Sequence, residues 1–205
     1  MSQNGQFDAL LIGAGPSGST AAALLAEHGH NVLLIEREKF PRYHIGESLM
    51  PYTWFTFERL GVLDWFKTAA CPKKHSVQFV STTGTVSQPF YFFETIKHPC
   101  ATTWQVVRSD FDRMMLDNAR ATGVDVKQGV TVRELITEGG RAVGVRADIK
   151  QGGSEAFRAN AIIDASGRDA VVASKLGWKR RDTDLNKISI FTYFKGGKRD
   201  PGLDE

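Results

Sequence analysis

The chain has 205 residues, which is enough for one domain with a substantial core, or for one domain and part of another. Hydrophobic residues make up 41% of the chain and charged residues 24%, and 26 basic against 23 acidic residues give a net charge of +3. These values are typical of a globular protein, and so small a net charge gives no reason to expect a nucleic acid partner.

The first residues carry no recognisable targeting signal. The apolar run from Ala9 to Ile12 ends at a glycine and has no basic residue before it, so the sequence predicts neither a signal peptide nor a membrane span here. We therefore expect a cytoplasmic protein. The two cysteines, Cys71 and Cys100, lack metal-ligand spacing and a CxxC arrangement, and we expect idle thiols and no metal site.

The beginning of the chain predicts a βαβ unit. Residues 7–12 are apolar as in a buried strand, residues 16–29 are rich in alanine and leucine as in a helix, and residues 31–35 form a second apolar run. Two such strands joined by a helix nearly always run parallel, with a right-handed crossover. The sequence therefore predicts an α/β, Rossmann-like fold with a parallel central sheet.

The pattern changes in the next part of the chain. Residues 51–60 and 63–67 look helical and unusually aromatic, and we expect most of these aromatic side chains in a core. Residues 76–93 then resemble two strands of a hairpin around Gly84. This hairpin is expected to belong to a different, antiparallel sheet.

The chain then returns to the first sheet. The stretch 109–123 is typical of a helix that has Ser109 as its N-cap and stops at Gly123. Strand patterns follow at residues 125–127, 130–137, 142–149 and 161–165. A last alternating run, residues 187–194, predicts a strand that has no visible partner.

Three glycines after the first predicted strand form a dinucleotide-binding fingerprint. Gly13, Gly15 and Gly18 have the GxGxxG spacing, and Glu36 ends the second strand about 20 residues on, where this motif places an acidic residue. Gly13 permits the tight turn, Gly15 lets the backbone approach a pyrophosphate, and Gly18 lets helix and strand pack closely. A glycine-rich turn without a ligand is the alternative interpretation.

The start of the predicted helix completes this site. After Pro16, unpaired N–H groups around Ser17 and the positive end of the helix dipole are expected to face the phosphates, so that both residues bind the cofactor. Glu36 is expected to accept hydrogen bonds from an adenosine ribose. The spacing does not separate NAD from FAD, because both carry ADP.

Two later segments resemble the FAD-binding half of the glutathione-reductase-like flavoproteins. They are "DFDRMMLDNARATGVDVKQGVTV", preceded by Arg108, and "AIIDASGRDAVVASKLG". The branch that they resemble contains aromatic hydroxylases, geranylgeranyl reductases and flavin-dependent halogenases. The resemblance implies FAD as the cofactor, with Arg108, Asp164 and Gly167 beside it; for each residue alone, a surface charge or a turn is an equally good interpretation.

The stretch "FPRYHIGESLMP" resembles the segment after the second strand of flavin-dependent halogenases, in which a GES triplet lies against the flavin. The resemblance implies cofactor contacts for Gly46, Glu47 and Ser48. We also predict that the basic residues between strand and triplet, Arg37 and Arg42, bind the cofactor. A compatible alternative is that Ser48 caps the helix that follows.

A second match lies in "KHSVQF", which follows the K-x-G-x-x-F pattern of phenol and pyrrole halogenases at Lys74 and Phe79 but has Ser76 in place of the glycine. In that family reduced FAD, O2 and halide yield hypohalous acid, and the lysine holds or captures it beside the substrate. An ammonium can donate hydrogen bonds and a deprotonated amine is a nucleophile. We therefore predict Lys74 as the catalytic residue; a solvated loop lysine is the alternative, with Lys73 as a neighbouring competitor.

Together these matches predict the N-terminal portion of a flavin-dependent halogenase, an oxidoreductase that uses reduced FAD from a separate reductase, O2 and a halide on an aromatic substrate, free or carrier-bound. The alternatives are a flavin monooxygenase or geranylgeranyl-reductase-like enzyme, and a non-catalytic flavin-binding module. Residues 1–72 and 100–180 are expected to form the FAD-binding domain, and residues 73–99 and 181–205 an incomplete substrate-domain sheet. Later motifs of the family are missing from the sequence, so we expect no turnover from this chain alone.

Overall fold

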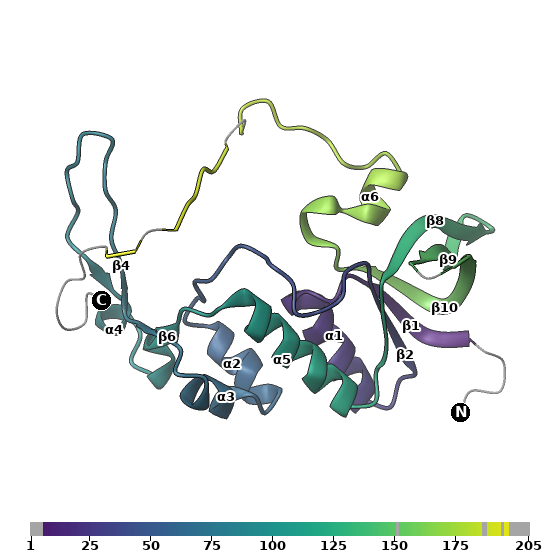
Figure 1. Ribbon diagram of the computed structural model, residues 1–205, viewed down its shortest axis with the longest axis horizontal. Coiled ribbons are helices and arrows are strands. Elements are labelled where there is room, and N and C mark those ends of the chain that lie inside the picture. Colours follow the sequence, from purple (N-terminus) through teal and green to yellow (C-terminus); the bar gives the residue numbers. More distant parts are fainter. Residues whose placement is uncertain (1–5, 151, 186–187, 194, 197–205) are drawn as a thin grey trace. The chain divides into compact units, whose positions relative to one another are not determined.

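The computed structural model describes residues 6–150, 152–185, 188–193 and 195–196 (Figure 1). The chain divides into two compact units. The boundaries between them fall after Ile45, after Val107 and after Arg180, so that residues 1–45 and 108–180 form the first unit and the remainder forms the second.

A six-stranded sheet forms the frame of the first unit, in the order β7-β2-β1-β10-β9-β8. Strand β1 (Gln6–Ile12) lies in its middle and pairs in parallel with β2 (Val32–Glu36) on one side and β10 (Ser154–Asp164) on the other. Strand β7 (Asp125–Gln128) pairs in parallel with β2. The predicted α/β fold with a parallel central sheet is confirmed.

The antiparallel strands β8 (Val130–Glu138) and β9 (Arg141–Ile149) extend this sheet from β10. Although β8 and β2 are not neighbours in the sheet, they are in contact, so β8 folds back over one face of the parallel strands. The buried side chains between them come from β1, β2, β8, β9 and β10: Leu10, Ile12, Leu33, Ile35, Val130, Val145, Ala147, Phe157 and Ala159. This packing brings the start of β8 next to the carboxyl ends of β1 and β2.

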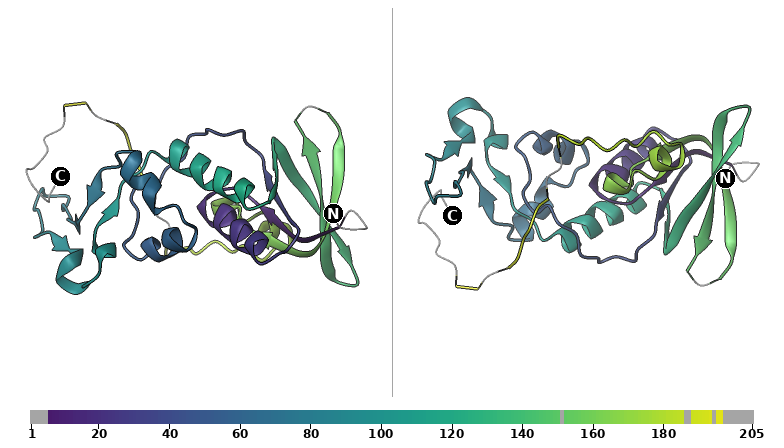
Figure 2. Two further views of the ribbon diagram at one scale, coloured as in Figure 1. Left: turned by 90° about the horizontal axis from the view of Figure 1, so that it is seen from below. Right: turned by 90° about the horizontal axis from the view of Figure 1, so that it is seen from above.

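Two helices lie side by side in the first unit, α1 (Pro16–Glu27) and α5 (Arg108–Ala121) (Figures 1 and 2). Helix α1 also packs on β1 and β2, and its buried face consists of glycine, serine and alanine, which allow a close approach. Ser109 is not the N-cap that the sequence predicted. Helix α5 already includes Arg108, whose side chain pairs with Asp112 one turn later, and the Ser109 hydroxyl donates to the carboxylate of Asp110.

Short elements make up the second unit: α2 (Thr53–Arg59), α3 (Leu63–Thr68), β3 (Lys73–Lys74), β4 (Ser76–Val77), β5 (Phe90–Tyr91), α4 (Phe92–Thr95), a 3-10 turn (Pro99–Ala101) and β6 (Thr103–Trp104). Strand β3 pairs with β6 and β4 with β5, each antiparallel. The β4–β5 pair and a bridge between Val80 and Val86 confirm the predicted hairpin around Gly84. The two predicted aromatic helices are present, at slightly different bounds.

Trp104 ties the aromatic helices to the small sheets. Its ring stacks on Trp54 of α2 and Phe66 of α3, with centroid distances of 5.4 and 4.4 Å. The division into compact units places residues 46–107 in the second unit. The assignment of residues 1–72 and 100–180 to the FAD-binding domain stays a prediction.

The segment before α2 is extended, so Ser48 is not the predicted helix cap. Ser48 forms an antiparallel bridge with Gln105, flanked by hydrogen bonds from Val106 N–H to Glu47 O and from Leu49 N–H to Trp104 O. Helix α2 begins only at Thr53, after Tyr52.

The predicted strand over residues 187–194 does not form within the described residues 188–193, which are not part of any sheet; residues 187 and 194 lie outside the described part. A strand needs an edge to pair with, and no pairing reaches these residues. Their apolar side chains are consequently open, with Ile188 and Ile190 87% and 89% exposed.

Some features are absent from the described ranges. Among these residues no helix has the length and apolar character that crossing a membrane requires, and no cluster of His, Cys, Asp or Glu is suited to hold a metal. Cys71 and Cys100 are not joined in a disulfide, and Cys100 is buried.

Candidate cofactor site

A cavity of about 420 Å³ opens in the first unit at the carboxyl ends of β1 and β2. In open α/β sheets this is the end where ligands bind. Its walls come from the loop after β1, the loop after β2, the start of α5, the start of β8 and the turn after β10. The lining residues are Ile12, Gly13, Gly15, Pro16, Ser17, Ile35, Glu36, Arg37, Glu38, Arg42, Tyr43, His44, Ile45, Arg108, Val130, Thr131, Val132, Ala165, Ser166, Gly167, Arg168, Asp169 and Val171.

The three fingerprint glycines have separate roles. Gly13 has a φ of +100°, and a Cβ there would lie 2.7 Å from the carbonyl oxygen of Ala165, so the turns after β1 and β10 approach closely. A Cβ on Gly18 would lie 1.9 Å from the carbonyl oxygen of Gly13. A Cβ on Gly15 would meet nothing closer than Nη2 of Arg42, at 3.9 Å. The fold therefore requires Gly13 and Gly18, whereas the space beside Gly15 is left for a ligand.

The first turn of α1 faces this space. Pro16 and Ser17 line the cavity, and Gly15, at the N-cap, has no side chain that could accept from the N–H groups of this turn. Unpaired N–H groups at the start of a twelve-residue helix favour an anion such as phosphate.

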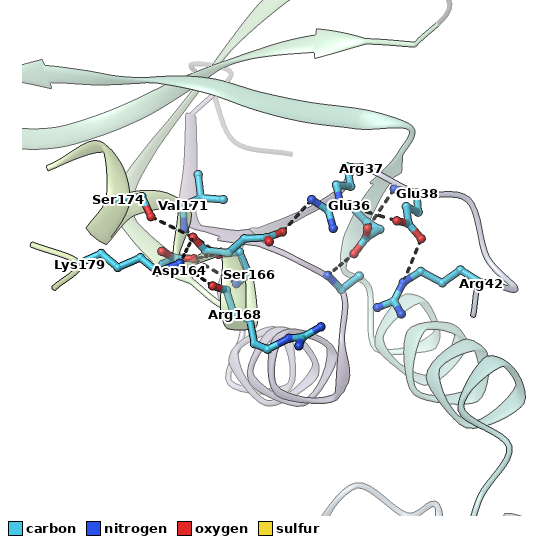
Figure 3. A network of polar contacts seen from close by, with 12 residues as sticks. Glu36, Arg37, Glu38, Arg42, Asp164, Ser166, Arg168, Val171, Ser174 and Lys179 are labelled. Atoms are coloured by element: carbon cyan, nitrogen blue, oxygen red, sulfur yellow. Dashed lines mark hydrogen bonds and ion pairs between the residues drawn. The ribbon is translucent and has the colours of Figure 1, made fainter. Parts of the chain in front are cut away.

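Glu36 stands at the end of β2 and is buried except for its cavity-facing edge. Its two carboxylate oxygens accept hydrogen bonds from the backbone N–H groups of Ala14 and Glu38, each 2.9 Å long (Figure 3). Each oxygen has a further lone pair, so the carboxylate can still accept from a ribose hydroxyl.

Two arginines meet at a buried carboxylate beside the cavity. Arg108 donates through Nε and Nη2 to both oxygens of Asp112, at 2.8 and 3.0 Å, and through Nη1 to the carbonyl of Ile45. Nη1 of Arg42 lies 3.1 Å from the same carboxylate. Asp112 is 0% exposed. The sequence interpretation missed Asp112, although an arginine and an aspartate four residues apart on a helix indicate such a pair.

The opposite wall is the turn after β10, formed by a 3-10 turn (Gly167–Asp169) and α6 (Val171–Lys175). Arg37 reaches across from the end of β2 to an ion pair with Asp169, 2.7 Å long (Figure 3). Gly167 and Arg168 line the cavity between them. The sequence interpretation did not single out Arg168 and Asp169, although both lie in the "SGRDA" segment that it quoted.

Asp164 shapes this turn and does not line the cavity. Its carboxylate accepts from the hydroxyl and N–H of Ser166 (Figure 3). It also accepts from the N–H of Val172. Partial burial, the largest influence, acts to raise the pKa of Asp164, but the hydrogen bonds from Ser166, Val172 and Ala173 outweigh it, and the pKa is lowered.

Most of the predicted cofactor residues thus lie around one cavity: Gly13, Gly15, Pro16, Ser17, Glu36, Arg37, Arg42, Arg108 and Gly167. Gly18 and Asp164 support the backbone of its walls. Gly46, Glu47 and Ser48 lie in the second unit, where Gly46 has a φ of +109° and Glu47 accepts from Tyr193 Oη at 3.4 Å. Contacts of this triplet with the flavin stay a prediction.

Lys74 lies in the second unit on β3, opposite Thr103 of β6. Its Nζ is 5.5 Å from the centroid of the Phe92 ring, and partial burial lowers the pKa of the amine. Lys73, the adjacent residue, is exposed. The two lysines therefore differ: Lys74 is partly buried beside an aromatic ring, whereas Lys73 has the exposure usual for a lysine.

Comparison with known protein families finds one that fits this cavity. A family model described as an FAD binding domain matches residues 6–193, nearly the whole chain. The chain belongs to this FAD-binding family. The predicted cofactor, FAD, is thereby confirmed, and the open space at Gly15, the uncapped start of α1 and the carboxylate of Glu36 suit its diphosphate and ribose.

The similar proteins include halogenases. The chain is 33% identical over 204 residues to the 1H-pyrrole-2-carbonyl-[peptidyl-carrier protein] brominase of Pseudoalteromonas luteoviolacea, covering 98% of this chain and 48% of that protein. Among solved structures, the myxobacterial chondrochloren halogenase CndH is 40% identical with a TM-score of 0.73, covering 80% of this chain and 38% of that one. A flavoprotein/dehydrogenase of Cytophaga hutchinsonii is 35% identical with a TM-score of 0.76, covering 84% and 42%. The predicted resemblance to flavin-dependent halogenases is confirmed, and the chain spans about half, or less, of the length of these proteins.

Proposed function

We propose that this chain is the FAD-binding part of a flavin-dependent halogenase, which uses reduced FAD, O2 and a halide to halogenate an aromatic ring. The observation that carries the proposal is the match of 98% of the chain to a brominase, at 33% identity. When bound, FAD supplies the redox chemistry that activates oxygen. The residues of the chain bind the cofactor and provide the amine of Lys74.

The cofactor lies, in this proposal, with its diphosphate at Gly15 and the start of α1 and its adenosine ribose at Glu36. The positive charges of Arg42 and Arg108 on the cavity wall favour the diphosphate. The GES triplet, residues 46–48, contacts the flavin ring, as the resemblance implies.

Lys74 is the proposed catalytic residue. An amine whose pKa is lowered by burial has a larger fraction of its neutral form near neutral pH than an exposed lysine, and it still donates hydrogen bonds when charged. Both states suit a group that holds or captures hypohalous acid beside the substrate.

The substrate is an aromatic ring, free or attached to a carrier protein, and the similar brominase bears a name that specifies a carrier-bound pyrrole. We further propose that a separate reductase supplies the reduced flavin and that the protein works in the cytoplasm.

A second candidate is a flavin monooxygenase or reductase on the same fold. It is favoured by the similarity to a flavoprotein/dehydrogenase, because one fold hosts several flavin chemistries. A non-catalytic FAD-binding module is the third candidate, because the match to the FAD binding domain family concerns the cofactor and not the reaction.

The experiment uses the protein expressed at the full length of its gene, with FAD, NADH, a flavin reductase, oxygen, bromide and either a pyrrole or a phenol. Mass spectrometry detects bromine by its isotope pair. We expect a product that requires bromide, that is lost in Lys74→Ala and that persists in the matched control Lys73→Ala. A product carrying oxygen without bromine would indicate the monooxygenase, and full bromination by Lys74→Ala would remove Lys74 from the mechanism. The 205-residue chain alone is expected to bind FAD without turnover.

A further inference from the structure

Asp112 is a charged side chain with no exposure to solvent, and such a group is costly unless it is paired. Both of its oxygens are in contact with arginines: Arg108 binds it as a two-pronged fork and Arg42 approaches the same Oδ2 atom. Asp112 does not line the cavity itself, but both of these arginines do. Any effect of Asp112 on a ligand therefore passes through them.

Arg42 is held in an unusual way. Its side chain is nine-tenths buried, and its Nη1 atom has no hydrogen-bond partner among the described residues, although it lies 3.1 Å from Asp112. The guanidinium is packed over the ring of Phe40, 4.6 Å from the centroid. The ion pair with Asp112 therefore accounts for Nη1, and Nη2 is the part of the guanidinium that can meet a ligand.

The direction of Arg42 indicates what that ligand is. Its Nη2 atom is the closest neighbour of the open space beside Gly15, where the first turn of α1 also points its N–H groups. Asp112 lies against both guanidinium groups, and Glu38 Oε2 is a second, more exposed carboxylate oxygen, 4.0 Å from Nε of Arg42. Helix start and guanidinium therefore converge on the place where the diphosphate of FAD binds.

We propose that Asp112 is a positioning residue for the cofactor diphosphate. Through its ion pairs it holds the side chains of Arg42 and Arg108 in the cavity wall, and Arg42, beside Gly15, binds the phosphate. The inference rests on the FAD-binding part of the proposed function and is independent of halogenation. In the absence of the Asp112 charge, the two guanidinium groups repel each other, and Arg42 keeps only its longer ion pair with Glu38, 4.0 Å from Nε, so its orientation is less well fixed.

The test compares ADP with adenosine, which differ only in the phosphates. ADP binding to the 205-residue chain is measured by titration calorimetry, and adenosine binding by ligand-observed NMR because it is weaker. In Asp112→Asn we expect the affinity for ADP to fall by about tenfold, the worth of one charge-assisted hydrogen bond, and the affinity for adenosine to change by less than about twofold. The matched control is Asp117→Asn, the same change at an exposed carboxylate of the same helix that pairs with Arg120, and it is expected to alter neither affinity.

A double-variant cycle separates positioning from general support. The cycle compares Arg42→Gln with the double variant Arg42→Gln/Asp112→Asn. If Asp112 acts through Arg42, the second substitution lowers the ADP affinity by less than about twofold when Arg42 is already replaced. If circular dichroism shows that Asp112→Asn does not fold, Arg42→Gln alone is used for the test, because it leaves the ion pair between Arg108 and Asp112 in place. It is expected to lower the affinity for ADP without lowering the affinity for adenosine.

Three results would overturn the proposal. Equal losses for ADP and adenosine mean that Asp112 only supports the fold. Unchanged ADP affinity in Arg42→Gln means that Arg42 does not bind the diphosphate. Absence of ADP binding by the unmodified chain overturns both this inference and the placement of FAD in the cavity, whereas a failed bromination test leaves the ADP result standing.

Discussion

Gly15 and Gly18 lie three residues apart, but different parts of the molecule require them. At Gly18 the carbonyl of Gly13 occupies the place of a side chain, at 1.9 Å from an added Cβ, so the close packing of α1 on β1 depends on glycine. At Gly15 the backbone has φ −68° and ψ −177°, which any residue adopts, and the neighbouring space is open. Only a bound phosphate would meet a side chain there.

This contrast gives a pair of matched alanine variants. We expect Gly18→Ala to lower the free energy of unfolding by at least about 1–3 kcal/mol, because backbone atoms must move. Gly15→Ala is expected to leave the thermal midpoint within a few degrees of the unmodified chain, since the N-cap preference for glycine over alanine is worth only about 1 kcal/mol. Its FAD affinity should nevertheless fall by about tenfold or more, because the methyl group fills the space of the diphosphate.

Thermal unfolding and anaerobic FAD titration measure both effects on the same samples. Tight FAD binding by Gly15→Ala would show that the diphosphate lies elsewhere in the cavity.

At the residue level, the sequence predicts the parts of the site that are close together in the chain. Gly13, Gly15 and Glu36 follow from spacing within one βαβ unit, because the loop and strand lengths of this unit fix their positions. Asp112 does not follow from spacing. Its significance depends on Arg42, which is distant in sequence and approaches it only when the loop after β2 packs against α5.

Among the elements, the turn from β10 to α6 depends on a single carboxylate. Asp164 ends β10, and its oxygens accept from Ser166 and from the N–H of Val172 at the start of α6. The 3-10 turn that carries Gly167 and Arg168 into the cavity wall lies between these contacts. A strand end, a turn and a helix start therefore share one acceptor.

We expect Asp164→Ala to reduce the free energy of unfolding at pH 7 by about 1–3 kcal/mol, toward the lower end because the group is partly exposed. The pKa of Asp164 is lowered in the folded chain, so its contribution is fully present above its ordinary value of 3.8 and is lost as the pH falls through the folded-state pKa. Urea unfolding at pH 7 and near pH 3 should therefore show a difference between the two chains that shrinks with acid.

The control is Asp148→Ala, which removes an exposed ion pair with Arg133 and is expected to cost less than about 1 kcal/mol. A difference for Asp164→Ala that grows in acid would contradict this account of the turn.

Comparison of the predicted and observed strands shows where the sequence pattern is sufficient to predict a strand. Strands β8 and β9 appear near their predicted positions because apolar residues recur along them and partner strands are available, and β7 appears because it pairs with β2. The run at 188–193 alternates equally well and forms no strand, since pairing depends on a neighbour that the pattern does not reveal. The same applies to Ser48, which a local pattern predicted as a helix cap and which pairs instead with Gln105.

Over the whole molecule, all the residues around the cavity come from the first unit, and the last segment contributes none of them. That segment exposes apolar side chains, namely Ile188, Ile190, Phe191 and Tyr193. The unit boundaries were the least predictable part of the fold, because they depend on which sheet Trp104 and its stacked neighbours join, and aromatic content alone does not decide this.

Ending the chain after Arg180 is therefore expected to change FAD affinity by less than about twofold and to reduce self-association. Flavin titration and size-exclusion chromatography with light scattering measure the two quantities. If FAD binding disappeared in the shortened chain, residues 181–205 would have to be assigned a part in the site.

The two strands that flank β1 in the sheet are synthesised at very different times. Ala9 of β1 pairs with Ala161 of β10, and between them lie the rest of the sheet and the whole 46–107 segment. At about 5–20 residues per second, a ribosome needs roughly 8–30 s to deliver the second partner after the first. During that interval β1 can pair with β2 on one side, while its other edge is without its final neighbour and is open to pairing with other chains.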